Sequence, residues 1–228
     1  MKTIQSIDKM MAILNTISQN NGKLTLSELG RQLNMALPTL HGFVGTLEKW
    51  DVLHRNSETG CFSLGNKIVQ LAGYCDREQL LIQTIHPYLL ALENEYDETV
   101  HFAIPDCNGI VYLDKVECTR PFRMTSMVGT RESFFQSAIG LVLAANIQGI
   151  PMTTEERKLV QNNCQERTSV LFHPDMEIYC FAVAILNLRD IPVGGISIAV
   201  PQCRYQDSLR DQILQRLSSV ANELRPLI

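Results

Sequence analysis

A predicted helix between residues 38 and 49 carries polar side chains whose chemistry suits contact with a nucleic acid. Its apolar residues fall on one face, which leaves hydroxyl, imidazole and ammonium groups on the other. Such groups donate hydrogen bonds to base edges and phosphates, and arginines on flanking segments can add phosphate contacts. The plainer interpretation of His41 is a surface histidine without a role, and that of Arg55 is a solvated charge. The candidates are Arg31, Thr39, His41, Thr46, Lys49 and Arg55.

A second group of residues has the spacing to bind a small anion. Ser137-Ala138-Ile139-Gly140 follows Gly129 and begins a predicted helix over 137–146. The first turn of a helix has backbone amides without intrahelical partners, and these amides can hold a carboxylate. A ligand site also needs a concave surface with a few well-placed polar groups, which these residues are expected to border.

Catalytic chemistry is not predicted. The sequence has no GxSxG, HExxH, Walker or GxGxxG motif, and its five histidines are scattered. His101 is interpreted as a structural histidine with satisfied hydrogen bonds, and the acidic run from Glu93 to Glu98 as a solvated helix end. Cys107 lies on a predicted turn without a basic neighbour to activate its thiol. We therefore expect a protein that is not an enzyme and holds no metal ion or cofactor.

The polar residues near the N-terminus need a helix-turn-helix scaffold, and the first 75 residues contain its elements. Apolar residues at helical spacing predict a first helix through Ile7–Ile17, which Asn20-Asn21-Gly22 ends. Thr25-Leu26-Ser27-Glu28 fits a capping box at the start of a second helix. Pro38 suits the first turn of the third helix, and Asn56–Gly60 suits a hairpin loop between two strands. Three helices and a two-stranded wing form a shape that can lie against duplex DNA.

The rest of the sequence predicts an antiparallel sheet with flanking helices. Residues 80–96 have a helical pattern that we expect Pro87 to interrupt and restart. From Thr99 the period changes to two, which places His101 on one face of a strand and Phe102 on the other. Further elements are expected at 110–117 and 123–128 (strands), 137–146 and 154–164 (helices), 179–186 and 193–200 (a hairpin) and 205–224 (a helix). This α+β arrangement is typical of a sensor domain.

Short phrases spread over nearly the whole chain form a specific pattern together, although none is decisive alone. The N-terminal phrases are Ser6-Ile7-Asp8-Lys9, Leu26-Ser27-Glu28-Leu29, Thr39-Leu40-His41, Thr46-Leu47-Glu48 and Phe62-Ser63-Leu64-Gly65. The later phrases are Glu98-Thr99-Val100-His101, Val111-Tyr112-Leu113-Asp114-Lys115-Val116-Glu117, Phe122-Arg123-Met124, Val128-Gly129-Thr130-Arg131, Ser137-Ala138-Ile139-Gly140 and Gly195-Ile196-Ser197-Ile198. In this order they resemble the IclR (isocitrate lyase regulator) family of bacterial transcription factors.

The resemblance implies an α+β protein with a winged helix-turn-helix domain followed by a GAF-like antiparallel-sheet domain that binds an effector. The expected boundaries are residues 1–65 for the DNA-binding domain, 66–76 for a linker helix and 77–228 for the effector-binding domain. The implied partners are double-stranded DNA, a small organic or aromatic acid and further copies of the chain. The copies would form a homodimer through the winged-helix region or a homotetramer through the sensor domain.

In the family, a cysteine and two serines on a strand hairpin contact the effector, which lies at the start of the helix predicted over 137–146. The cysteine matches Cys180 and the first serine Ser197, but the second falls at Ala199, whose side chain cannot form a hydrogen bond. Met127 and neighbouring aromatic residues favour a hydrophobic or aromatic effector, or a pocket that has lost its ligand. A core thiol is the plainer interpretation of Cys180. The expected effector-binding residues are Met127, Gly129, Ser137, Ala138, Ile139, Cys180, Ser197 and Ala199.

The third helix departs from the family pattern. Relatives typically carry Lys or Arg where Leu37 stands, Ser at Pro38 and Arg at Gly42, so the usual basic contacts are missing. Gly42 and Gly45 each weaken the helix by up to about 1 kcal/mol relative to Ala. Either these glycines let the helix backbone approach DNA closely, or the helix is degenerate and binds DNA weakly.

The net charge of −4 is distributed unevenly along the 228 residues. Residues 1–75 hold seven Lys and Arg against five Asp and Glu, whereas residues 76–228 hold thirteen against nineteen. This asymmetry favours an N-terminal domain that faces nucleic acid, although an excess of two positive charges is small. Seven scattered cysteines without a CxxC pair fit a reducing cytoplasm, and the sequence predicts neither a signal peptide nor a membrane span.

We therefore expect a cytoplasmic, effector-responsive transcriptional regulator that binds DNA, with the family leaning towards repression of catabolic genes. The alternative is an interaction protein that keeps the fold, binds DNA weakly and acts by oligomerising with a full-strength relative. A redox sensor that uses the cysteines is a third option. DNA affinity separates the first two hypotheses, and thiol titration before and after mild oxidation tests the third.

If the third helix reads bases, the double substitution Thr39→Ala with His41→Ala should weaken binding to the cognate site more than binding to random DNA. The reason is that base contacts carry sequence specificity whereas phosphate contacts do not. Fluorescence anisotropy with the two duplexes measures the difference. An equal loss on both sequences would mean that the recognition face is misassigned.

Overall fold

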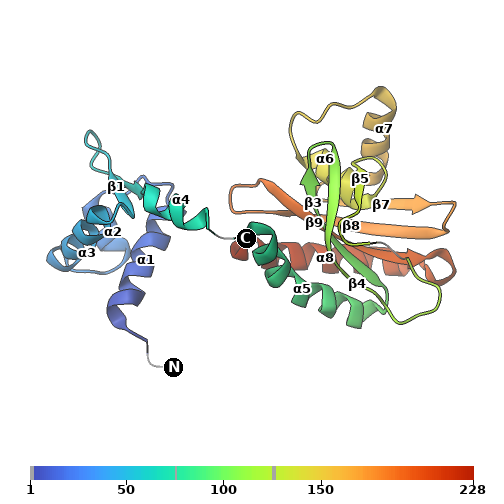
Figure 1. Ribbon diagram of the computed structural model, residues 1–228, viewed down its shortest axis with the longest axis horizontal. Coiled ribbons are helices and arrows are strands. Elements are labelled where there is room, and N and C mark those ends of the chain that lie inside the picture. The colour runs from blue at the N-terminus through green and yellow to red at the C-terminus, as the bar shows by residue number, and fades with distance from the viewer. Residues whose placement is uncertain (1–2, 75, 125–126) are drawn as a thin grey trace. The chain divides into compact units, whose positions relative to one another are not determined.

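Two units, each with a hydrophobic core of its own, make up the chain. The computed structural model describes residues 3–74, 76–124 and 127–228, and it divides the chain into Met1–Asp76 and Arg77–Ile228 (Figure 1). Cys75, at the end of the predicted linker helix, lies outside the described residues. Thr125 and Ser126, inside the strand predicted over 123–128, also lie outside them.

The N-terminal unit consists of a helix-turn-helix and a two-stranded wing. Its elements are α1 (Gln5–Gln19), α2 (Leu26–Gln32), α3 (Leu37–Lys49), β1 (Leu53–Arg55), β2 (Phe62–Leu64) and α4 (Asn66–Ala72). The two strands pair antiparallel, with Leu53 opposite Leu64. The core contains Ile13, Ile17, Leu24, Leu29, Leu40, Val44, Leu47, Leu53 and Phe62. The predicted winged helix-turn-helix is confirmed.

Short-range hydrogen bonds explain why the elements of this unit begin where they do. The Glu28 carboxylate accepts from the backbone N–H of Thr25 at 2.8 Å and from its hydroxyl at 2.6 Å, so the predicted capping box is present. These bonds hold the pKa of the Glu28 carboxyl below its usual value. In the wing, the side-chain oxygen of Asn56 accepts from the backbone amides of Glu58 and Thr59, both at 2.9 Å, and shapes the loop.

The C-terminal unit is built on a seven-stranded antiparallel sheet in the order β5-β4-β3-β9-β8-β7-β6. The strands are β3 (Thr99–Asp106), β4 (Gly109–Val116), β5 (Arg131–Ser133), β6 (Cys164–Gln165), β7 (Thr168–His173), β8 (Ile178–Leu186) and β9 (Pro192–Pro201). The helices are α5 (Arg77–Tyr96), α6 (Ala138–Asn146), α7 (Thr154–Asn163), α8 (Asp207–Leu224) and the 3-10 turns η1 (Gln202–Arg204) and η2 (Arg225–Leu227). This α+β architecture agrees with the sequence prediction.

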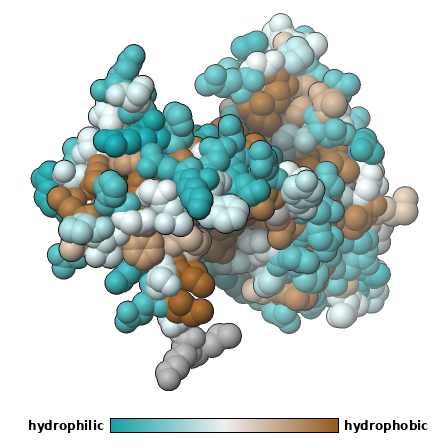
Figure 2. Space-filling model, turned by 60° about the vertical axis from the view of Figure 1, so that its left-hand side comes forward, coloured by the Kyte–Doolittle hydropathy of each residue, from teal (hydrophilic) through white to brown (hydrophobic). Residues whose placement is uncertain are grey.

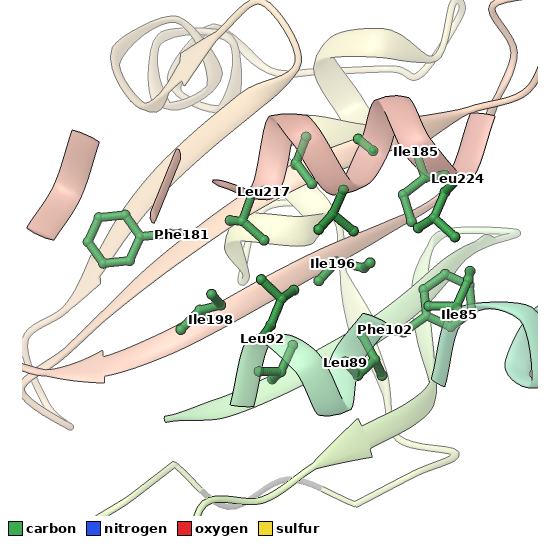
Figure 3. Packing of buried hydrophobic residues seen from close by; sticks show 14 of the residues in the cluster. Ile85, Leu89, Leu92, Phe102, Phe181, Ile185, Ile196, Ile198, Leu217 and Leu224 are labelled. Carbon is green, nitrogen blue, oxygen red and sulfur yellow. The ribbon is translucent and has the colours of Figure 1, made fainter. Parts of the chain in front are cut away.

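The sheet has a different helix layer on each face, because its side chains alternate. On β3, Phe102 packs in the core shared with α5 and α8, whereas Ala103 packs in the core shared with α6. Figure 3 shows side chains of α5 and α8 meeting those of the sheet on the first face. Each fully buried Leu or Ile there contributes about 1.5–3 kcal/mol relative to exposure.

Helix α6 lies unusually close to the second face. Its residues from Ala138 to Ala144 are all buried. A Cβ at Gly195 of β9 would lie 2.8 Å from Cγ2 of Ile139, and a Cβ at Gly140 would lie 2.3 Å from the carbonyl oxygen of Phe134. Glycine at these two positions therefore lets α6 approach both the sheet and the segment that precedes it.

Two expectations about the C-terminal unit are wrong. Helix α5 runs without a break through Pro87, because Ile85 and Leu89 on either side are fully buried in the same core and hold the helix together despite one lost hydrogen bond. The third strand is β5 at Arg131–Ser133, and the described residues of 123–128 form no strand. Pairing with Gly109–Val111 of β4 explains this placement, since pairing partners far apart in the sequence decide where a short edge strand forms. Strands β6 and β7 were not predicted.

The acidic run at the end of α5 is also not a solvated face throughout. Glu98 is only 3% exposed, and its two carboxylate oxygens accept from Arg204 at 2.5 Å (Nε) and 2.7 Å (Nη2). Arg204 also donates to the carbonyl oxygen of Phe122 at 3.0 Å. This bidentate pair ties the start of β3 to η1 after β9, and hydrogen bonding to Glu98 raises the pKa of Arg204.

Removing the arginine should therefore destabilise the C-terminal unit. We expect Arg204→Met to lower the free energy of unfolding by about 3 kcal/mol, because it leaves a buried carboxylate without its counter-charge. Urea denaturation at pH 7 measures this. The double variant Glu98→Gln with Arg204→Met is the control, since it removes both charges and should lose clearly less than the single variant. Equal losses in the two variants would show that the buried charge is not the cause.

Candidate nucleic-acid interface and ligand pocket

The outward face of α3 has glycine backbone at its centre. At 100° per residue, Gly42 and Gly45 lie opposite the buried Leu40, Val44 and Leu47. A Cβ added at either glycine would meet no atom within 4 Å, so both positions are open. The helix surface at this point is therefore its own peptide backbone rather than a row of side chains.

The predicted DNA-contacting side chains surround this bare centre. Helical spacing places Thr39 on one flank, His41 on the other and Lys49 at the end of the helix. The Thr46 hydroxyl donates to the carbonyl oxygen of Gly42 at 2.8 Å and keeps its lone pairs for an outside donor. All six candidates are exposed, namely Arg31, Thr39, His41, Thr46, Lys49 and Arg55.

The wing supplies one ordered cation. The guanidinium carbon of Arg55 on β1 lies 5.6 Å from the centre of the Phe62 ring on β2. A cation held against an aromatic face loses less freedom when it binds a phosphate than a fully mobile one. Arg55 therefore remains a candidate for phosphate contact on the wing.

A mostly apolar groove runs between α1 and α3. It has a volume of about 430 Å³ and is lined by Ser6, Ile7, Met10, Thr39, Gly42, Phe43, Thr46 and Leu47. Figure 2 shows hydrophobic surface on this unit near the start of α1. The two threonines thus border an apolar groove as well as the outward face of α3.

A small cavity lies at the N-terminal end of α6, on the face of the sheet that this helix covers. Its volume is about 230 Å³, below the roughly 300–1,000 Å³ of drug-sized pockets. Strands β3, β4, β8 and β9 supply its floor, and β5 and β7 supply part of its wall. The lining residues are His101, Tyr112, Met124, Glu132, Gln136, Ser137, Ala138, His173, Met176, Cys180 and Ser197.

The start of α6 presents hydrogen-bond donors at this cavity. The Ser137 hydroxyl oxygen caps the helix by accepting from the backbone N–H of Gly140 at 3.1 Å. The amides of Ala138 and Ile139, in the first turn, have no partner within the helix. These donors and the positive end of the helix dipole can stabilise an anionic group.

Two histidines of the pocket have a ring nitrogen without a partner. Nε2 of His101 and Nε2 of His173 are buried and form no hydrogen bond. His101 is 1% exposed and lies directly opposite Ser197 in the β3–β9 ladder. Burial lowers the pKa of His101 to about 4, and burial also lowers the pKa of His173. The expectation of a satisfied structural histidine at position 101 is therefore wrong, because its buried Nε2 has no hydrogen-bond partner among the described residues.

Tyr112 connects the remaining polar groups. Its hydroxyl donates to the Glu132 carboxylate at 3.1 Å, and the Ser137 hydroxyl also interacts with it. Burial and the nearby Glu132 carboxylate raise the pKa of Tyr112 above its usual value. The phenol is therefore a permanent hydrogen-bond donor between the start of α6 and Glu132.

Cys180 lies at the bottom of the cavity as a neutral thiol. Burial raises its pKa to about 12, and its sulfur is 4.0 Å from that of Met124. A protonated, buried thiol reacts slowly with oxidants. This environment argues against Cys180 as the sensing group of a redox switch.

The cavity collects some of the predicted effector residues and leaves others out. Ser137, Ala138, Cys180 and Ser197 line it. Ile139 and Ala199 are buried in the core shared with α6, and Ala199 pairs with Cys180 across the β8–β9 ladder. Met127, 75% exposed, and Gly129 lie on the segment before β5 and do not line the cavity.

Five polar lining residues were missed, namely His101, Tyr112, Glu132, Gln136 and His173. His101 and Tyr112 could have been found, because the two-residue period of their strands places them on the face towards α6. Glu132 and His173 had no such signal, since β5 and β7 were not predicted. The observed lining is consequently more polar than the apolar surroundings expected from the sequence.

Within the described ranges, no three His, Cys, Asp or Glu side chains gather where they could hold a metal ion. No helix in the described part of the chain combines the length and the apolar character needed to cross a membrane. The two units therefore differ in kind: α3 and the wing present exposed hydrogen-bond donors, and the C-terminal unit has a small cavity at the start of α6.

Comparisons with known proteins connect both units to one family. Residues 6–57 match the sequence model described as IclR helix-turn-helix domain, and residues 74–169 match that described as Bacterial transcriptional regulator IclR C-terminal. The chain is 24% identical over 226 residues to the Transcriptional repressor IclR of Escherichia coli (strain K12). This similarity covers 90% of the chain and 82% of that repressor.

Solved structures share the fold. Pseudomonas aeruginosa HmgR superimposes with a TM-score of 0.72 at 15% identity, covering 97% of this chain and 96% of that one. An IclR homolog from Microbacterium hydrocarbonoxydans complexed with 4-hydroxybenzoate gives a TM-score of 0.56 at 17% identity, covering 96% and 98%. At such identities the likeness extends to the fold alone.

The buried neutral histidine has a consequence for stability. Because the pKa of His101 is about 4 when folded and near 6.5 when unfolded, the unfolded chain binds more protons between these values. The stabilisation is fully present above pH 6.5 and is lost as the pH falls towards 4. We expect about 2 kcal/mol less stability from His101 at pH 5 than at pH 7.

Urea denaturation at the two pH values measures this change, and His101→Gln is the control. The variant keeps a polar side chain but cannot titrate, so its loss between pH 7 and pH 5 should be smaller by that amount. An identical pH dependence in both proteins would mean that His101 is not held neutral.

Proposed function

The chain belongs to the IclR family of bacterial transcriptional regulators, and on that basis we propose that it is a regulator whose DNA affinity responds to a small organic or aromatic acid. DNA binding through the helix-turn-helix and a role in transcription follow from family membership. Repression of catabolic genes, location in the cytoplasm and the effector are parts of the proposal.

Contact with DNA is assigned to α3 and the wing. We propose that the open backbone at Gly42 and Gly45 approaches the major groove, while Thr39 and His41 reach base edges on either side. Phosphate contacts by Arg31, Lys49 and Arg55 would then supply most of the affinity, as is common for protein–DNA complexes. The Thr46 hydroxyl would form a hydrogen bond with the DNA backbone that borders the same groove.

The cavity at α6 carries the effector part of the proposal. Its free amides and the Ser137 cap support an anion site, and the unpartnered His101 nitrogen supports a ligand that fills the space. One structural relative is a complex with 4-hydroxybenzoate, which is an acid of suitable size for such a pocket. By analogy, a carboxylate would bind at the amides of Ala138 and Ile139.

Regulation would proceed by a shift between two arrangements of paired winged helices. A ligand can shift such an equilibrium only by the difference in its affinity for the two states, which is typically about 1–3 kcal/mol. The exposed apolar residues Ile7 and Met11 on α1 and Val69 on α4 support a contact between copies in this region. The proposed units are a DNA-binding domain (1–65), a linker helix (66–76) and an effector-binding domain (77–228).

The alternative is an interaction protein with weak DNA binding. It is favoured by one observation, the lack of a basic side chain on α3 before Lys49 at the end of the helix. Such a protein would act by oligomerising with a relative that binds DNA strongly. The two proposals differ in what the glycines of α3 do.

Gly42→Ala distinguishes them. If the bare backbone approaches DNA, the added methyl group should weaken binding to the duplex upstream of the protein's own gene by about tenfold or more. The same change should raise the free energy of unfolding by up to about 1 kcal/mol, because Ala favours the helix and meets no neighbour. Fluorescence anisotropy over a salt series and urea denaturation measure the two effects.

Weaker binding by a more stable variant cannot be attributed to unfolding, so the pair of measurements contains its own control. Tight, selective binding by the unsubstituted chain, lost in Gly42→Ala, supports the regulator. Weak and unselective binding by both proteins would transfer support to the interaction protein.

A further inference from the structure

We propose that the cavity at α6 binds a zwitterion, namely a small α-amino acid with an uncharged side chain, whose ammonium group pairs with Glu132 while its carboxylate lies at the start of α6. The inference rests on the proposed effector pocket and specifies its ligand class. It depends on four features of the lining: an uncompensated carboxylate, two neutral histidines, a bridging phenol and an apolar wall.

The Glu132 carboxylate is the only charged group among the described lining residues at neutral pH, and none of those residues is Lys or Arg. Across the described part of the chain, the ion pairs do not include Glu132, and its carboxylate accepts only the hydrogen bond from Tyr112. Its negative charge acts on the whole cavity, since it raises the pKa of both Tyr112 and Cys180. A ligand with a carboxylate alone would meet this charge, at a cost of about 4 kcal/mol for two charges 4 Å apart near a protein surface.

The histidines cannot neutralise Glu132 at neutral pH. Burial lowers the pKa values of His101 and His173, so both rings are uncharged at pH 7. Each nevertheless has a buried Nε2 without a hydrogen-bond partner. A buried polar atom costs about 1–3 kcal/mol when it is left unpaired, which favours a ligand rich in hydrogen-bonding groups over an apolar one.

The short separation between the anion site at the start of α6 and the cation site at Glu132 indicates an α-amino acid. The Tyr112 hydroxyl interacts with Ser137, the cap of α6, and also donates to Glu132. The anion site and the cation site are thus separated by one hydroxyl group. Ammonium and carboxylate groups on the same carbon match this short separation, whereas an ω-amino acid would place them farther apart.

The rest of the lining limits the side chain of the ligand. Met124, Met176 and the neutral thiol of Cys180 form an apolar wall that offers nothing to a second charge. The cavity of about 230 Å³ leaves room for a short side chain beyond the two poles. Aliphatic and thioether side chains fit this wall, because methionine adapts its shape to them.

The test compares ligands that differ only in the ammonium group. The full-length chain is titrated by calorimetry at pH 7 with L-alanine, L-leucine and L-methionine, and with propionate, 4-methylpentanoate and 4-(methylsulfanyl)butanoate as their respective matched acids. L-lactate replaces the ammonium by a hydroxyl group, and 4-hydroxybenzoate represents aromatic acids. We expect at least one of the three amino acids to bind at least tenfold more tightly than its matched acid and than L-lactate.

Glu132→Gln keeps an acceptor for Tyr112 but removes the charge. It should weaken binding of the amino acid at least tenfold and leave the matched acid unchanged or bound more tightly. Glu155→Gln removes an equal charge from an exposed position on α7 outside the cavity and should change neither.

The outcomes separate this inference from the function on which it rests. A simple acid, L-lactate or 4-hydroxybenzoate could instead bind more tightly than the amino acids, with no effect of Glu132→Gln. That result would overturn the proposal of a zwitterionic ligand but support an effector pocket. No binding by any probe would overturn the zwitterion and count against the pocket, while DNA binding measured by anisotropy on the same sample would still report on the regulator.

Discussion

The close packing of α6 on the sheet is the constraint on which the ligand pocket depends. Gly195 on β9 and Gly140 within the helix remove the Cβ atoms that would hold α6 away from its neighbours. The helix can then be apolar on all sides, because sheet, α7 and connecting segments bury it completely from Ala138 to Ala144. Its N-terminus, which must carry unsatisfied amides, is the one part of the helix that reaches the polar cavity.

The polar side chains at the N-terminal end of α6 can be buried because most of them form hydrogen bonds with one another. Ser137 caps the helix, and Tyr112 joins it to Glu132, so three of the polar groups satisfy each other. The two histidine nitrogens are left over. A protein retains such unsatisfied groups at a cost to stability, and they are concentrated at functional or strained sites.

In the N-terminal unit, a hydrophobic core and local hydrogen bonds orient an exposed helix face. The core of aliphatic side chains and Phe62 holds α3 with the glycine face outward, and the capping box at Thr25 and the Asn56 loop position the neighbouring elements. The groove between α1 and α3 in this unit has a mostly apolar lining. The chemistry of the unit consists of exposed donors around open backbone, which suits an extended partner with a regular spacing of charges.

Local sequence signals determined most helices, the β1–β2, β3–β4 and β8–β9 hairpins, the capping box and the two faces of β3, because short-range periodicity and hydrogen bonding suffice for them. The same signals identified Ser137 and, through the family resemblance, Cys180 as pocket residues. Only the tertiary structure decided the continuity of α5 through Pro87, the pairing of Glu98 with Arg204, and the place of β5. It alone brought Glu132 and His173 to the cavity. These features depend on contacts between residues far apart in the chain, and no local pattern of residue types encodes such contacts.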